Sequence, residues 1–113
     1  MLINDWTIWQ DSPRYGCVDN PSYDWFARRS SNGHIMETMG PYPDVVDLFI
    51  ACEGMTPKRA GEVLKQQAQW PHWGNARKFM TKDEFAHVNA LWGAWPNGNV
   101  SFMDMLYHVA RRQ

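Results

Sequence analysis

The pattern of apolar residues changes once along this chain, at the segment Gly40-Pro41-Tyr42-Pro43, which is expected to end a sheet. Before this segment, short alternating runs rich in aromatic and β-branched residues are separated by turn residues, which is typical of β-strands. After it, apolar residues recur at helical spacing between capping residues and prolines. Because the strands precede the helices, we expect an α+β fold in which a small N-terminal antiparallel β-sheet of hairpins packs against about four C-terminal helices.

The strongest strand signal is a hairpin. Residues 23–29 and 34–39 predict paired strands, and between them Ser30-Ser31-Asn32-Gly33 contains the Asn-Gly pair that tight hairpin turns favour. Residues 6–9 predict an earlier strand, and residues 15–18 predict its return strand.

The predicted helices carry recognisable start and stop signals. Asp44 is the expected N-cap of residues 45–52, which are apolar on almost every side and therefore predict the central core helix. Gly54 is expected to end this helix in the left-handed conformation. The later helices begin at Thr56-Pro57, at the capping box of Thr81 and Glu84 and at Ser101, and the first two of these end before Pro71 and Pro96.

Length and composition indicate one soluble domain. The chain has 113 residues, of which 44% are hydrophobic and 20% charged; residues 1–40 are its β-rich part and residues 44–113 its helical part. The longest wholly apolar run, residues 48–52, is far short of the ~20 residues of a membrane-spanning helix. Residues 1–6 lack the features of a secretory signal. We therefore expect a cytoplasmic protein that does not enter membranes.

No group of residues matches a known catalytic or metal-binding pattern. Cys17 and Cys52 lack the C-x-x-C spacing, and the four histidines show no ligand spacing, so no metal or cofactor is expected. There is no nucleophile elbow, phosphate-binding loop or closely spaced carboxylate pair. We expect a protein that is not an enzyme. The remaining catalytic hypothesis is a nucleophilic Cys17 or Cys52 paired with a histidine.

Charge is divided unevenly along the chain. Residues 1–54 carry eight acidic and three basic residues, whereas residues 55–113 carry four acidic and eight basic residues. Such a dipolar chain suits a partner whose surface potential is also uneven. The net charge of −1 excludes a DNA mimic, which would be strongly negative as a whole.

The seven tryptophans exceed what one core of this size needs. Trp6, Trp25, Trp92 and Trp95 have the spacing of inward-facing core residues. The connection at residues 70–79 differs, because its aromatic residues lie beside basic residues in a segment interrupted by Pro and Gly. This composition is typical of the residues that contribute most to binding in protein interfaces. The predicted binding residues are Trp70, His72, Trp73, Arg77, Lys78 and Phe79, together with Arg28 and Arg29 on the hairpin. The alternative is that Trp70 and Trp73 fold back over the gap between two helices.

Residues 52–64 resemble a helix-hairpin-helix motif. Its pattern is matched at Gly54, Met55, Ala60 and Val63, whereas Thr56 stands where the motif has its second glycine. The resemblance implies sequence-independent DNA binding through hairpin N–H groups that meet phosphates. Its candidate contacts are Gly54, Thr56, Lys58 and Arg59. The alternative is an ordinary corner between two helices, with Lys58 and Arg59 solvated.

These patterns favour a non-enzymatic protein-binding module that acts by covering a partner's surface; a homodimer fits them equally well. In size and in its opening of strands followed by a helix, the chain loosely resembles small phage-encoded accessory proteins, including anti-defence inhibitors such as anti-CRISPRs. This resemblance implies inhibition of a bacterial protein complex in the host cytoplasm. The alternative function is a small nucleic-acid-binding domain that uses residues 54–59 and the basic C-terminal half.

Overall fold

The computed structural model describes residues 2–10, 24–30, 33, 35–69, 76–95 and 100–112. It confirms the α+β fold predicted from the sequence. One antiparallel sheet contains, in chain order, β1 (Leu2–Ile3), β2 (Trp6–Gln10), β3 (Trp25–Ser30) and β4 (Met36–Tyr42). The helices that follow are α1 (Val45–Ala51), α2 (Pro57–Gln69), the single turn α3 (Ala76–Phe79), α4 (Lys82–Ala94) and α5 (Phe102–Ala110).

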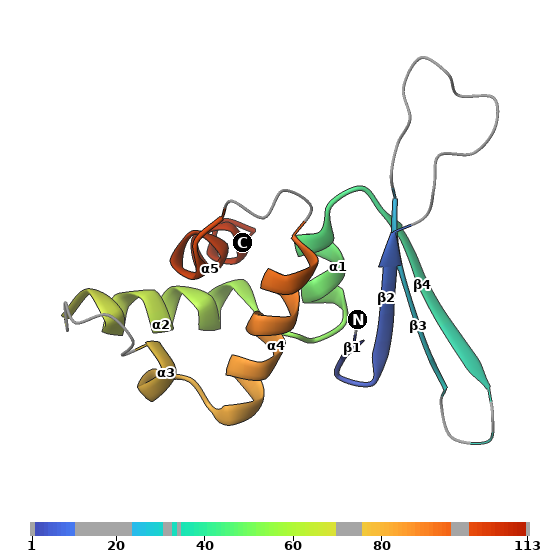
Figure 1. Ribbon diagram of the computed structural model, residues 1–113, viewed down its shortest axis with the longest axis horizontal. Coiled ribbons are helices and arrows are strands. Elements are labelled where there is room, and N and C mark those ends of the chain that lie inside the picture. Colours follow the sequence, from blue (N-terminus) through green and yellow to red (C-terminus); the bar gives the residue numbers. More distant parts are fainter. Residues whose placement is uncertain are drawn as a thin grey trace, which may run out of the picture.

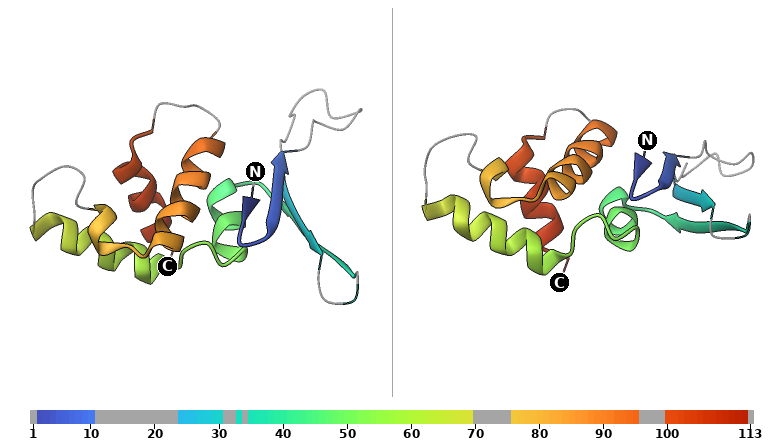
Figure 2. Two further views of the ribbon diagram at one scale, coloured as in Figure 1. Left: turned by 60° about the horizontal axis from the view of Figure 1, so that its bottom comes forward. Right: turned by 90° about the horizontal axis from the view of Figure 1, so that it is seen from below.

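All these helices lie on one side of the sheet (Figures 1 and 2). Helix α1 packs against β3 and β4 and also touches α4 and α5, so it lies between the sheet and the other helices (Figure 1). Val45, Val46, Leu48 and Phe49 of α1 are buried, as expected for the central core helix. None of the helices in the described residues is both long and apolar enough to cross a membrane.

The first strand pair was missed by the sequence analysis. Ile3 pairs with Trp6, so Asn4 and Asp5 form a two-residue turn, with φ angles of 47° and 67°. Both residues at positive φ are typical of a type I′ hairpin turn. The side-chain amide of Asn4 also donates to the carbonyl oxygens of Cys52 (3.3 Å) and Glu53 (2.6 Å). This turn therefore joins the N-terminus of the chain to the end of α1.

The predicted hairpin at residues 23–39 is present as β3 and β4, but β4 is longer than expected. It continues to Tyr42, which pairs with Trp25 beyond an irregularity in register, so the prediction that residues 40–43 end the sheet is wrong for residues 40–42. Gly40 makes this possible: its φ is +124°, and a Cβ atom there would lie 2.8 Å from the Trp25 carbonyl oxygen. The predicted strand at residues 15–18 lies outside the described residues.

The two faces of the sheet differ in burial. The residues that face the helices are buried, namely Ile3, Trp6, Ile8, Trp25 and Ala27. On the opposite face, Thr7 and Arg28 are exposed, and Trp9 and Phe26 are half-buried. This alternation along β2 and β3 follows from the two-residue repeat of a strand.

Helix α1 begins as predicted but ends differently. The Asp44 side chain accepts a hydrogen bond from Val46 N–H, which confirms the N-cap. At the other end, the left-handed residue is Glu53 (φ 60°), not Gly54 as the sequence predicts. The N–H of Gly54 donates to the Phe49 carbonyl (3.0 Å) and that of Glu53 to the Ile50 carbonyl (2.9 Å). This is the Schellman arrangement, with a non-glycine residue in its left-handed position.

We expect Glu53→Gly to raise the free energy of unfolding by about 0.5–1 kcal/mol, because glycine reaches positive φ without the clash that a Cβ atom causes. Urea unfolding followed by circular dichroism measures the change. Glu53→Ala is the control, since it removes the exposed carboxylate but keeps the Cβ atom. If alanine stabilises as much as glycine, the gain comes from the charge and not from the backbone.

The other predicted helix starts are also confirmed. The Thr56 hydroxyl accepts from Arg59 N–H at the start of α2, Thr81 and Glu84 form a reciprocal capping box on α4, and Ser101 accepts from Asp104 N–H on α5. Each cap satisfies helix N–H groups that have no partner within their own helix. These caps therefore determine the residues at which α2, α4 and α5 begin.

Candidate functional site

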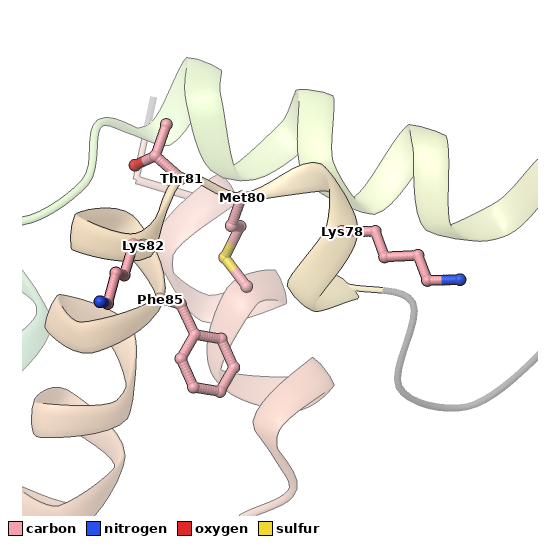
Figure 3. A pocket seen from close by; sticks show the side chains of 5 residues that line it. All are labelled: Lys78, Met80, Thr81, Lys82 and Phe85. Atoms are coloured by element: carbon pink, nitrogen blue, oxygen red, sulfur yellow. The ribbon is translucent and has the colours of Figure 1, made fainter.

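A groove of about 380 Å³ lies where α3 passes into α4. It is lined by Lys78, Met80, Thr81, Lys82 and Phe85, and most of its surface is apolar. Met80 is buried and Phe85 is half-buried, and their side chains lie next to each other in the groove (Figure 3). Lys78 and Lys82 are exposed and extend away from each other at its two sides (Figure 3). The groove thus has an apolar floor and a basic rim.

The corner between α3 and α4 is held in place from α2. The Arg59 guanidinium donates to both carboxylate oxygens of Glu84, at 2.6 and 3.1 Å, and to the Phe79 carbonyl at 2.9 Å. Glu84 in turn accepts from Thr81 N–H at 3.0 Å as part of the capping box. The hydrogen bonds from Arg59 are the main reason that the pKa of Glu84 is lowered, and those to Glu84 raise the pKa of Arg59. The groove therefore has a rigid frame.

Aromatic side chains continue from the groove along α4 and α5. The Phe85 ring lies 5.5 Å from that of Phe102, which meets Trp92 edge-on at 6.3 Å. Trp92 is 45% exposed, so the prediction that it faces inward is wrong. Its indole N–H donates to the Val100 carbonyl at 2.8 Å, which holds the ring at the surface between the two helices.

The predicted binding residues of the 70–79 connection differ in their position and burial in the structure. Lys78 lines the groove. Phe79 is half-buried, and its carbonyl accepts from Arg59. Arg77 lies on α3, but its side chain is not among those described, and Trp70, His72 and Trp73 lie outside the described residues. Met80, Lys82 and Phe85 were not among the predicted binding residues, although all three line the groove.

Arg28 and Arg29 lie on opposite faces of the sheet. Arg29 is on the side of the helices, where its guanidinium stacks over Trp6 at 4.5 Å and its Nε donates to Glu37 at 2.8 Å. Arg28 is exposed on the other face, 5.8 Å from the Trp9 ring, which stacks with Phe26. Helix α1 lies between this sheet and the helices of the groove (Figure 1), so the arginines and the groove do not form one surface.

The residues of the helix-hairpin-helix resemblance are mostly committed to contacts within the chain. Gly54 is buried, and its N–H donates to the Phe49 carbonyl. Thr56 caps α2, and Arg59 binds Glu84 and the Phe79 carbonyl. Thr56 and Lys58 are exposed, and of these two only Lys58 makes no side-chain hydrogen bond or ion pair to another described residue. The geometry is that of a corner between two helices.

The described residues give little support to the hypothesis of a nucleophilic cysteine paired with a histidine. Cys52 is fully buried, and this burial raises the pKa of its thiol to about 11. It is therefore protonated at neutral pH, unlike a nucleophilic cysteine. Cys17 lies in a part of the chain that the structure does not describe. No group of His, Cys, Asp and Glu within the described residues could hold a metal ion.

The groove can hold an apolar group and pair with negative charge at its rim. The one hydroxyl among its lining residues, that of Thr81, caps α4 by accepting from Glu84 N–H. The chain matches no protein-family model, no curated protein and no solved structure. Its function must therefore be inferred from its own geometry.

Proposed function

We propose that this chain is a non-enzymatic protein-binding module that acts by covering a surface of its partner. The observation that carries the proposal is the apolar groove between α3 and α4, together with the ring contacts that link Phe85 of the groove, through Phe102, to the half-exposed Trp92. Aromatic and methionine side chains are enriched in protein interfaces, and the residues that contribute most to binding lie in pockets of this kind.

The rigidity of the groove also supports binding. Arg59, Glu84 and Thr81 hold the corner with hydrogen bonds of 2.6–3.1 Å. A preformed site loses little conformational entropy when a partner docks, so more of the contact energy contributes to affinity. A small module that covers a functional surface inhibits its partner, which is the role implied by the resemblance to phage-encoded anti-defence proteins.

Nucleic-acid binding is less well supported. The hairpin N–H groups of Glu53 and Gly54 donate to carbonyls of α1, and the Arg59 guanidinium is held by Glu84. DNA binding by such a hairpin needs these donors to be directed at phosphates. The contacts of residues 53–59 therefore favour a structural role.

Site-specific photo-crosslinking tests the proposal. A benzophenone amino acid replaces Lys82 at the rim of the groove or, as a control, Lys65, an exposed residue of α2 that does not line it. Each protein is irradiated in a lysate of the cells that make this chain naturally. We expect a discrete adduct with another protein from position 82 and none from position 65. Equal labelling from both positions, a nucleic-acid adduct, or an adduct only with a second copy of the chain would overturn the proposal.

A further inference from the structure

The charged side chains that line the groove are all positive. Lys78 and Lys82 line it, and no acidic residue does. Among the described residues, neither lysine takes part in an ion pair. The nearby Glu84 carboxylate is bound by Arg59 on both oxygens, so it is not available to neutralise them. Asp83 follows Lys82 on α4, but neighbouring residues on a helix do not face each other.

The placement of the two lysines adds a geometric constraint. They extend in opposite directions from an apolar floor formed by Met80 and Phe85 (Figure 3). The volume of about 380 Å³ is near the lower limit for small-molecule pockets, roughly 300–1,000 Å³, so it suits a bulky side chain. An apolar side chain seated on this floor would bring the residues before and after it towards the two ammonium groups.

From this complementarity we infer that the groove binds an acidic segment of the partner protein, in which a bulky apolar side chain is flanked by Asp or Glu on both sides. The inference rests on the proposed function and adds the chemistry of the partner. The groove belongs to the half of the chain that carries eight basic and four acidic residues. This excess of positive charge would also steer an acidic segment towards the groove and speed association.

Selection from a random peptide library, with the whole chain as bait, tests the inference and does not require the partner to be identified first. A parallel selection uses Lys78→Glu/Lys82→Glu as bait. We expect peptides selected by the natural chain to have Asp or Glu on both sides of a bulky apolar residue, and the reversed rim to select Lys or Arg at the same positions. Lys82→Glu leaves the fold intact, because an acidic residue is favoured in the first turn of a helix.

Affinities of one selected peptide give the quantitative test. Fluorescence anisotropy should show about tenfold weaker binding to Lys78→Glu/Lys82→Glu, and binding to the natural chain should weaken as salt rises, because exposed charges are screened. Lys58→Glu/Lys65→Glu makes the same change of charge at two exposed positions outside the groove and should have almost no effect.

The outcomes separate the two proposals. Peptides that need Met80 and Phe85 but show no preference for acidic residues would overturn the acidic-segment inference and leave the protein-binding proposal standing. Loss of binding in Met80→Ala and in Phe85→Ala, with circular dichroism showing an intact fold for each variant, establishes that need. If no selected peptide depends on the groove, or if the chain forms a dimer through it, both proposals fail.

Discussion

Replacing Gly54 with alanine is expected to lower the free energy of unfolding by about 3 kcal/mol, the upper part of the usual range for overpacking a core. A Cβ atom at this position would lie only 2.3 Å from Cε2 and 2.6 Å from Cδ2 of Phe49. Phe49 is fully buried in the core, so its ring has no open space into which to move. Urea unfolding followed by circular dichroism measures the loss.

The same substitution at Gly61 provides a matched control. Gly61 is within α2, and a Cβ atom there would have no atom within 4 Å apart from the adjacent backbone of its own helix. Gly61→Ala should therefore raise stability by about 0.5–1 kcal/mol, because alanine loses less backbone entropy than glycine in a helix. If both substitutions shift stability in the same direction, the close contact between residue 54 and Phe49 is not the reason for the glycine.

This pair of variants also bears on the helix-hairpin-helix resemblance. In a DNA-binding hairpin, the glycine allows a phosphate to approach the backbone, and its replacement would weaken DNA binding without unfolding the protein. In the structure, the glycine instead allows the end of α1 to pass over Phe49. A large loss of stability in Gly54→Ala would support the structural role.

The parts of the fold that were predicted correctly depend on local rules. The caps at Asp44, Thr81 and Ser101 involve residues two or three positions away, so the sequence contains both partners of each hydrogen bond within one turn. The missed strand β1 has only two residues, too few for any periodicity to be recognised. The extension of β4 to Tyr42 depends on pairing with Trp25, seventeen positions earlier in the chain, and on the backbone freedom of Gly40.

The candidate site was harder to predict because burial depends on what covers each face. Helical spacing places Phe85 and Trp92 on an apolar face of α4, but it cannot show that other helices leave part of that face open. Lys78 was identified because it lies beside aromatic residues within the connection at residues 70–79. Arg28 and Arg29 were treated together, although neighbouring residues of a strand point to opposite faces. That alternation was readable from the sequence.

The second large effect is expected on removing Arg59. Arg59→Ala should lower the free energy of unfolding by about 2 kcal/mol, because hydrogen bonds to charged groups contribute more than neutral ones and Glu84 would be left partly buried without its partner. The Glu84 side chain is only 18% exposed, whereas that of Arg59 is 35% exposed, so solvent screening limits the effect. Lys58→Ala, at an exposed neighbouring position, should change stability by less than about 0.5 kcal/mol.

The dependence of this loss on pH identifies its source. Arg59 lowers the pKa of Glu84 in the folded chain, so the ion pair stabilises the fold above the ordinary carboxyl pKa, and that contribution is lost as pH falls through the lowered value. The stability gap between the natural chain and Arg59→Ala should therefore shrink in acid. It should not vanish, because the hydrogen bond from Arg59 to the Phe79 carbonyl does not titrate. Glu84→Gln retains a capping-box side chain without the charge. In that background the gap should vary much less with pH, because Arg59 then keeps only its longer contact, 3.4 Å, to the exposed carboxylate of Glu62. A gap that shrinks equally in both backgrounds would show that another acidic group is responsible, and the frame of the groove would then not depend on the pair of Arg59 and Glu84.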